Sequence, residues 1–114
     1  MIMEQLRSEL SQSDDRWTLR LIGSVGPRTH NLIWPSENST AFLQNMIKAG
    51  AKKLIIDLTE TERFDSHGLR LLLNAQKEFL AKNTAIVLRN PNSHLNRLFQ
   101  IMQFDSVFEI EFVD

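Results

Sequence analysis

The second half of the chain alternates short apolar runs with helical patterns, and this alternation most constrains the fold. Leu54–Ile56 and Ala85–Leu88 are short apolar runs of the kind found in strands that are covered on both faces. Between them, residues 66–82 carry a helical stripe whose predicted core side chains are Leu69, Leu72, Leu73, Gln76, Phe79 and Leu80. Strand, helix and strand in this order predict parallel neighbours with right-handed connections. The chain is therefore expected to fold as an α/β domain.

The N-terminal third predicts an antiparallel hairpin followed by a long loop. The first ten residues indicate a weak edge strand, and residues 11–15 are rich in the Ser and Asp side chains that favour turns. Residues 17–21 alternate apolar and polar side chains, as a half-buried strand does. Residues 23–37 are predicted to form the least regular segment. Its Trp34 fits two interpretations equally, a loop packed onto the sheet edge or an exposed aromatic used in docking.

The remaining elements complete the order β-β-α-β-α-β-α-β. A helix is expected to begin near Ser36–Ser39, to bury Phe42, Leu43, Met46 and Ile47, and to end at Gly50. Residues 59–63 are predicted to be a loop. Residues 90–93 break the chain and cap a third helix, whose stripe is Leu95, Leu98, Phe99 and Met102. Val107–Val113 alternates as a closing strand. The prediction is a mixed sheet of about five strands with three or more helices.

Length and charge limit the functional classes. With 114 residues the chain has room for one domain, expected to span 1–114. A formal net charge of −1 gives no global attraction to nucleic acid or anionic lipid. No apolar run is long enough to cross a bilayer, and Glu4 and Arg7 interrupt any signal-peptide core. The absence of cysteine fits a reducing compartment. We therefore expect a soluble cytoplasmic protein without direct membrane insertion.

The most informative segment joins a strand to a helix through residues 57–69. Ser66 stands where the helix begins, at the positive end of its dipole, and its residue type alone favours a simple N-cap. Gly68 in the first turn costs the helix about 1 kcal/mol relative to alanine, which indicates a close approach to the backbone.

Catalytic and metal sites are not indicated by the sequence. The three histidines, His30, His67 and His94, show no metal-ligand spacing and have no cysteine beside them. Asp65, Ser66 and His67 have the residue types of a hydrolase triad, but neighbours in sequence do not face one another. The prediction is a protein that is not an enzyme and uses no metal or cofactor.

At these residues the chain resembles the STAS domains, named for sulfate transporters and anti-sigma factor antagonists. The resemblance is carried by Asp57-Leu58, Phe64-Asp65-Ser66-His67-Gly68-Leu69, Asn90-Pro91, Arg97-Leu98-Phe99 and Phe104-Asp105-Ser106-Val107-Phe108-Glu109-Ile110. It covers roughly residues 52–110, and its order of elements agrees with the pattern above.

The resemblance implies partner switching in a bacterial regulatory pathway. In that family the unphosphorylated protein binds an anti-sigma factor, which is often also a serine kinase, and a serine phosphatase reverses the modification. The serine that matches the modified one is Ser66. The implied partner-binding residues are Asp65, Ser66, His67, Gly68, Leu69 and Arg70. The alternative is a constitutive STAS subunit of a bacterial lipid-transport ABC complex.

Overall fold

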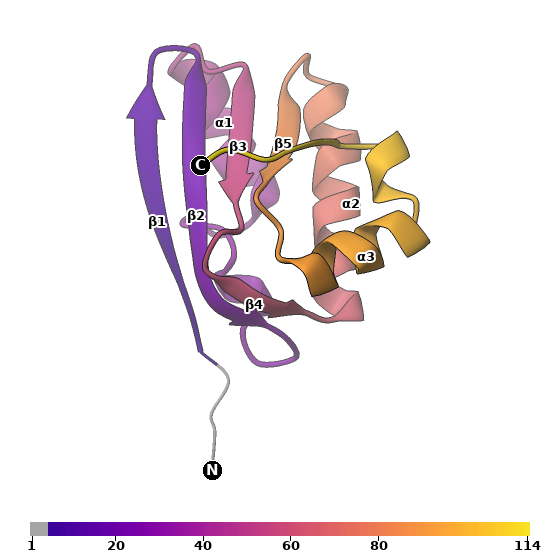
Figure 1. Cartoon of the computed structure of the whole chain (residues 1–114). Helices are drawn as coiled ribbons and strands as arrows, with labels where there is room; N and C mark the ends of the chain where they lie inside the picture. Colours follow the sequence, from indigo (N-terminus) through magenta and orange to yellow (C-terminus); the bar gives the residue numbers. More distant parts are fainter. Residues whose placement is uncertain (1–4) are drawn as a thin grey trace.

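The computed structural model describes residues 5–114, and it opens with an antiparallel hairpin (Figure 1). β1 (Leu6–Ser13) pairs with β2 (Arg16–Val25) from Leu6↔Gly23 to Ser13↔Arg16. The predicted edge strand is confirmed over residues 6–10, and its part in residues 1–4 lies outside the described residues. The predicted turn over 11–15 is too long, because β1 continues to Ser13 and the chain reverses at Asp14, where φ is +48°.

The sheet is mixed, with the order β1-β2-β3-β5-β6. β3 (Lys53–Asp57) and β5 (Ala85–Arg89) run parallel to β2, as the crossover pattern predicts. β6 is parallel to β5 but spans only Glu109–Glu111, so the predicted closing strand is shorter than expected. The predicted alternation holds at Phe108, which is buried, but it fails after the strand, where Phe112 and Val113 are exposed.

A sixth strand replaces part of a predicted loop. β4 (Thr61–Phe64) lies off the main path of the sheet and pairs in parallel with the end of β2. The Thr61 hydroxyl donates to the Leu21 carbonyl over 2.7 Å, which anchors the strand. Because β2 continues through Val25, the first residues of the predicted loop 23–37 are also strand. Sequence patterning missed β4 because Glu62 and Arg63 both point to solvent and break the alternation.

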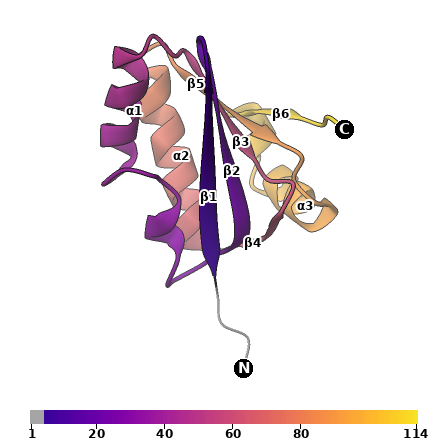
Figure 2. The same cartoon turned by 90° about the vertical axis from the view of Figure 1, so that its left-hand side faces the viewer.

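Two helices cover one face of the sheet, and the third lies on the other (Figure 2). α1 (Ser39–Lys48) and α2 (Ser66–Leu80) pack over β2, β3 and β5, whereas α3 (Ser93–Ile101) starts beside β4. The predicted loop also contains a short 3-10 helix, η1 (His30–Leu32), and a second, η2 (Phe104–Ser106), precedes β6. Across the described residues, no helix is both long and apolar enough to span a membrane.

The core lies mainly between the sheet and the pair α1 and α2. Most predicted core positions of the helices are buried, Leu73 and Leu98 are half-buried against the core, and three positions at helix ends are exposed: Ile47, Leu80 and Met102. Trp34 is only 8% exposed, and its ring lies 5.6 Å from that of Phe42 and 6.0 Å from that of Phe79. The interpretation of Trp34 as an exposed docking aromatic is therefore wrong, because its ring packs in the core against side chains of α1 and α2.

Candidate functional site at the start of α2

The start of α2 is fixed by Asp65. Its backbone N–H donates to the Val25 carbonyl over 2.9 Å, which ties the residue to the end of β2. Its side-chain Oδ1 accepts from the Gly68 N–H over 2.9 Å, so Asp65 is the N-cap of the helix. The interpretation of Ser66 as the N-cap is therefore wrong. Because Asp65 already accepts from the Gly68 N–H, which has no partner within the helix, the Ser66 side chain is not needed as a cap.

Ser66 is the first residue of α2, and it is exposed. Its hydroxyl makes no hydrogen bond with any of the described residues, unlike that of Ser39 at the first position of α1, which donates to Glu78. A substituent on the Ser66 oxygen can therefore enter solvent without breaking a hydrogen bond within the described chain.

Gly68 holds the helix close to the end of the hairpin. A Cβ atom at this position would lie 2.5 Å from Val25 Cγ1 and 2.8 Å from Phe64 Cδ1. Real carbon atoms do not approach so closely, so any larger residue forces α2 away from β2 and β4. The close approach expected from the sequence is confirmed, and the approaching groups are the protein's own core side chains.

The six predicted contact residues separate into an outer and an inner group. Ser66, His67 and Arg70 are exposed, and Asp65 is half-buried. Gly68 and Leu69 are buried, so they can support a docking surface but cannot form its outer face.

All three histidines of the chain gather around the start of α2, although they are far apart in sequence. The ring of His30 in η1 stacks on that of His67, with centroids 5.7 Å apart and planes 23° apart. His94, near the start of α3, lines a depression together with Arg63 and Asp65. We call the group formed by Ser66, His67, Arg70, Arg63, His30 and His94 the Ser66 surface. Sequence spacing could not reveal it, because η1 and α3 reach this end of the molecule only through the fold.

The Ser66 surface does not have the geometry of a hydrolase. His67 Nδ1 lies 3.5 Å from Asp65 Oδ2, but no hydrogen bond joins the Ser66 hydroxyl to His67 within the described part of the chain. A nucleophilic serine requires that bond to lose its proton. Among residues 5–114, no three His, Cys, Asp or Glu side chains are placed to hold a metal ion.

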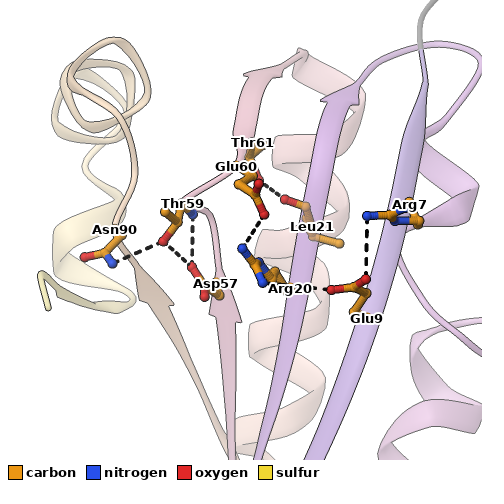
Figure 3. Close-up of polar contacts among 9 residues, drawn as sticks. All are labelled: Arg7, Glu9, Arg20, Leu21, Asp57, Thr59, Glu60, Thr61 and Asn90. Atoms are coloured by element: carbon orange, nitrogen blue, oxygen red, sulfur yellow. Dashed lines mark hydrogen bonds and ion pairs between the residues drawn. The ribbon is translucent and has the colours of Figure 1, made fainter. Parts of the chain in front are cut away.

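A polar network braces the turn that leads from β3 to β4 (Figure 3). Asp57 Oδ1 accepts from the Thr59 N–H over 3.0 Å and from its hydroxyl over 2.6 Å, and Asn90 Nδ2 donates to the Thr59 hydroxyl over 3.1 Å. Glu60 pairs with Arg20 of β2, as Figure 3 shows. Asp57 thus fixes the chain direction into β4 and, through β4, the position of Asp65.

The comparisons with known proteins agree with this architecture. Residues 8–111 match the family model described as "Mlab, STAS domain". The anti-sigma factor antagonist SpoIIAA in its unphosphorylated form superposes with a TM-score of 0.74, at 16% identity over 95% of this chain and 89% of the other. An anti-sigma factor antagonist from Mycobacterium paratuberculosis superposes with a TM-score of 0.74, at 19% identity over 94% of this chain and 86% of the other. The Bacillus cell fate determinant SpoIIAA in the phosphorylated form gives 0.70, at 16% identity over 95% and 92%.

The fold and the strand-to-helix site together define a small STAS domain with the fold of the anti-sigma factor antagonists. Because the family model covers nearly the whole chain, the chain belongs to the STAS domain family. The resemblance noted from the sequence is confirmed.

Proposed function

We propose that the chain is a binding protein switched by phosphorylation of Ser66. In its unphosphorylated form it binds an anti-sigma factor or serine kinase in the cytoplasm, and a serine phosphatase restores that form. The chain itself catalyses no reaction in this proposal. The observation that carries it is the exposed Ser66 hydroxyl, free of hydrogen bonds to the described residues, on a helix start that other residues hold in place.

The local chemistry favours a switch that acts on binding and leaves the fold intact. A phosphate adds about −1.5 to −2 charges at neutral pH. At Ser66 it would stand beside the Asp65 carboxylate, in the middle of a surface with exposed cations. Because Asp65 caps the helix, modification of Ser66 leaves the cap in place. Two of the similar structures are the phosphorylated and unphosphorylated forms of SpoIIAA, which supports the same chemistry for this fold.

The chain supplies a matched control for the modification experiment. Ser93 is the exposed first residue of α3 and follows the N-cap Asn92, so its local setting repeats that of Ser66. Incubation with the cognate serine kinase and ATP should add one phosphate to the wild type and to Ser93→Ala, and none to Ser66→Ala, as read by intact mass and phosphopeptide mapping. Stoichiometric phosphate on Ser66→Ala would contradict the site.

A second candidate is a constitutive subunit of a bacterial lipid-transport ABC complex. The matching family model is named for Mlab and not for the antagonists, which keeps this candidate in consideration. Purification of the tagged chain from its native cells separates the two functions. Recovery of an ATPase and a membrane permease supports the constitutive subunit, whereas an anti-sigma factor or serine kinase supports the switch.

A further inference from the structure

β1 forms one end of the sheet, and its outer edge is open to pairing with another strand. Within the described chain β1 pairs only with β2, and in Figure 2 it faces the viewer with no other described helix or strand in front of it. Edge strands are usually protected by shortness, proline, lysine, a bulge or an inward-pointing charge. β1 has eight residues, contains no proline or lysine, and pairs with β2 in one continuous register. The strand at the other end of the sheet, β6, has only three residues, so β1 is the more open of the two ends.

The backbone groups on this outer edge belong to alternate residues of β1. The Ser24 N–H donates to the Gln5 carbonyl over 2.8 Å, so the backbone of Gln5 points toward β2. Along an antiparallel strand the direction of these groups alternates from one residue to the next. The N–H and carbonyl groups of Leu6, Ser8 and Leu10 therefore point away from β2, toward the position that a further strand would occupy.

The side chains of β1 separate into an apolar face and a charged face. Leu6 and Leu10 are half-buried and pack against the core. Arg7 and Glu9 are exposed on the opposite face, where Glu9 lies 3.6 Å from Arg7 and 3.9 Å from Arg20 of β2, as Figure 3 shows. Residues opposite each other in an antiparallel pair share a face of the sheet. An added strand must therefore bring apolar side chains to one face and complementary charges to the other.

A second copy of β1 meets both requirements in the antiparallel register that is centred on Ser8. Leu6 of one copy then faces the partner's Leu10 on the apolar face. Arg7 faces the partner's Glu9 on the charged face, and the two-fold symmetry repeats this pair with the copies exchanged. A register centred on Arg7 or on Glu9 instead places two like charges directly opposite each other, which is unfavourable. The charge pattern of β1 thus favours the register centred on Ser8 over both of these neighbours.

We propose that the protein forms a symmetric dimer in which the β1 strands of two copies pair antiparallel about a two-fold axis at Ser8. The outward backbone groups of Leu6, Ser8 and Leu10 then hydrogen-bond those of the partner's β1, and the two sheets become one continuous sheet. Arg7 of each copy pairs with the partner's Glu9. None of these residues belongs to the Ser66 surface, so the dimer goes beyond the proposed switch and does not depend on it.

Sedimentation equilibrium with charge-reversal variants tests the dimer and its register. The intact chain should show a concentration-dependent dimer between about 10 µM and 1 mM. Arg7→Glu and Glu9→Arg should each raise the dimer Kd about tenfold, because each places like charges opposite each other. An equimolar mixture of these two variants should associate about as tightly as wild type, since each copy supplies the charges that the other lacks. Glu109→Arg is the matched control, because it makes the same reversal at an exposed position of β6 and should leave the Kd unchanged.

Cysteine cross-linking locates the two-fold axis, because the chain has no cysteine of its own. Under mild oxidation Ser8→Cys should form a disulfide-linked dimer, whereas Ser13→Cys, at the far end of β1, should not. Melting temperatures should show that every variant folds. A chain that stays monomeric over this range overturns the inference, whether β1 then remains unpaired or pairs with another protein. A dimer that ignores both β1 reversals, or a mixture that associates no better than its components, also overturns it.

Discussion

Gly68→Ala gives the sharpest test of how the site is built, because two effects of opposite sign compete there. In an ordinary helix interior this substitution stabilises by about 1 kcal/mol. Here the new methyl carbon would lie 2.5 Å from Val25 Cγ1 and 2.8 and 2.9 Å from two ring carbons of Phe64. Normal carbon contacts are about 3.5–4.0 Å, so these groups must separate by about 1 Å.

The crowded side chains have little freedom to make that space. Val25 and Phe64 are only 2% and 6% exposed, so neither can turn into solvent. Overpacking a buried site costs about 1–3 kcal/mol, which equals or exceeds the gain of about 1 kcal/mol in helix propensity. We therefore expect Gly68→Ala to lower the free energy of unfolding by up to about 2 kcal/mol and to lower the melting temperature accordingly.

Urea denaturation with two further variants tests this reasoning. Asn74→Ala, at an exposed position of the same helix, should stabilise by a few tenths of a kcal/mol. Gly68→Ala combined with Val25→Ala should be less destabilising than the sum of the single changes, because the smaller side chain relieves the contact. A Gly68→Ala protein as stable as Asn74→Ala would refute the close approach.

Three more substitutions should lower stability in the same urea assay. Gln76→Leu removes the amide that accepts from the Ile86 N–H over 2.9 Å and donates to the Ile86 carbonyl over 3.3 Å. Two buried backbone groups then lose a partner, and the free energy of unfolding should fall by about 2–4 kcal/mol. The control Gln100→Leu, at an exposed position of α3, should change it little. Asp65→Ala should cost about 1 kcal/mol through loss of the N-cap, whereas Asp65→Asn should retain most of it, and equal losses would contradict the capping geometry. Glu78→Gln should cost about 0.5–1 kcal/mol, because its carboxylate accepts hydroxyl bonds at the N-terminus of α1; no change in the urea midpoint would count against that contact.

Hydrophobic periodicity predicts the elements that bury a continuous run or one face of apolar side chains. It does not predict an element that is held by pairing with a distant strand. β3 and β5 were found because both are continuous apolar runs. β4 was missed because only Thr61 and Phe64 are buried, and the strand depends on pairing with a distant part of β2. The polar residue predicted on the core face of α2, Gln76, is indeed buried, and its partners on β5 explain why a polar side chain is tolerated there.

The candidate site was predictable in its position along the chain but not in its composition. The strand-to-helix pattern located residues 65–70, yet it assigned the cap to Ser66, because both Asp and Ser are favoured at that position and only the geometry distinguishes them. The contributions of His30, His94 and Arg63 could not be predicted from the sequence. His30 and His94 belong to elements that are distant from Ser66 in sequence, and Arg63 belongs to β4, which the sequence pattern predicts as a loop.

The dissociation constant of the chain and its purified partner, measured with and without a phosphate on Ser66, tests the central claim most directly. We expect tight binding of the unmodified protein, loss of binding on phosphorylation, and an unchanged melting profile. Equal constants for the two forms would contradict it, and so would a phosphorylated protein that releases its partner only because it has unfolded.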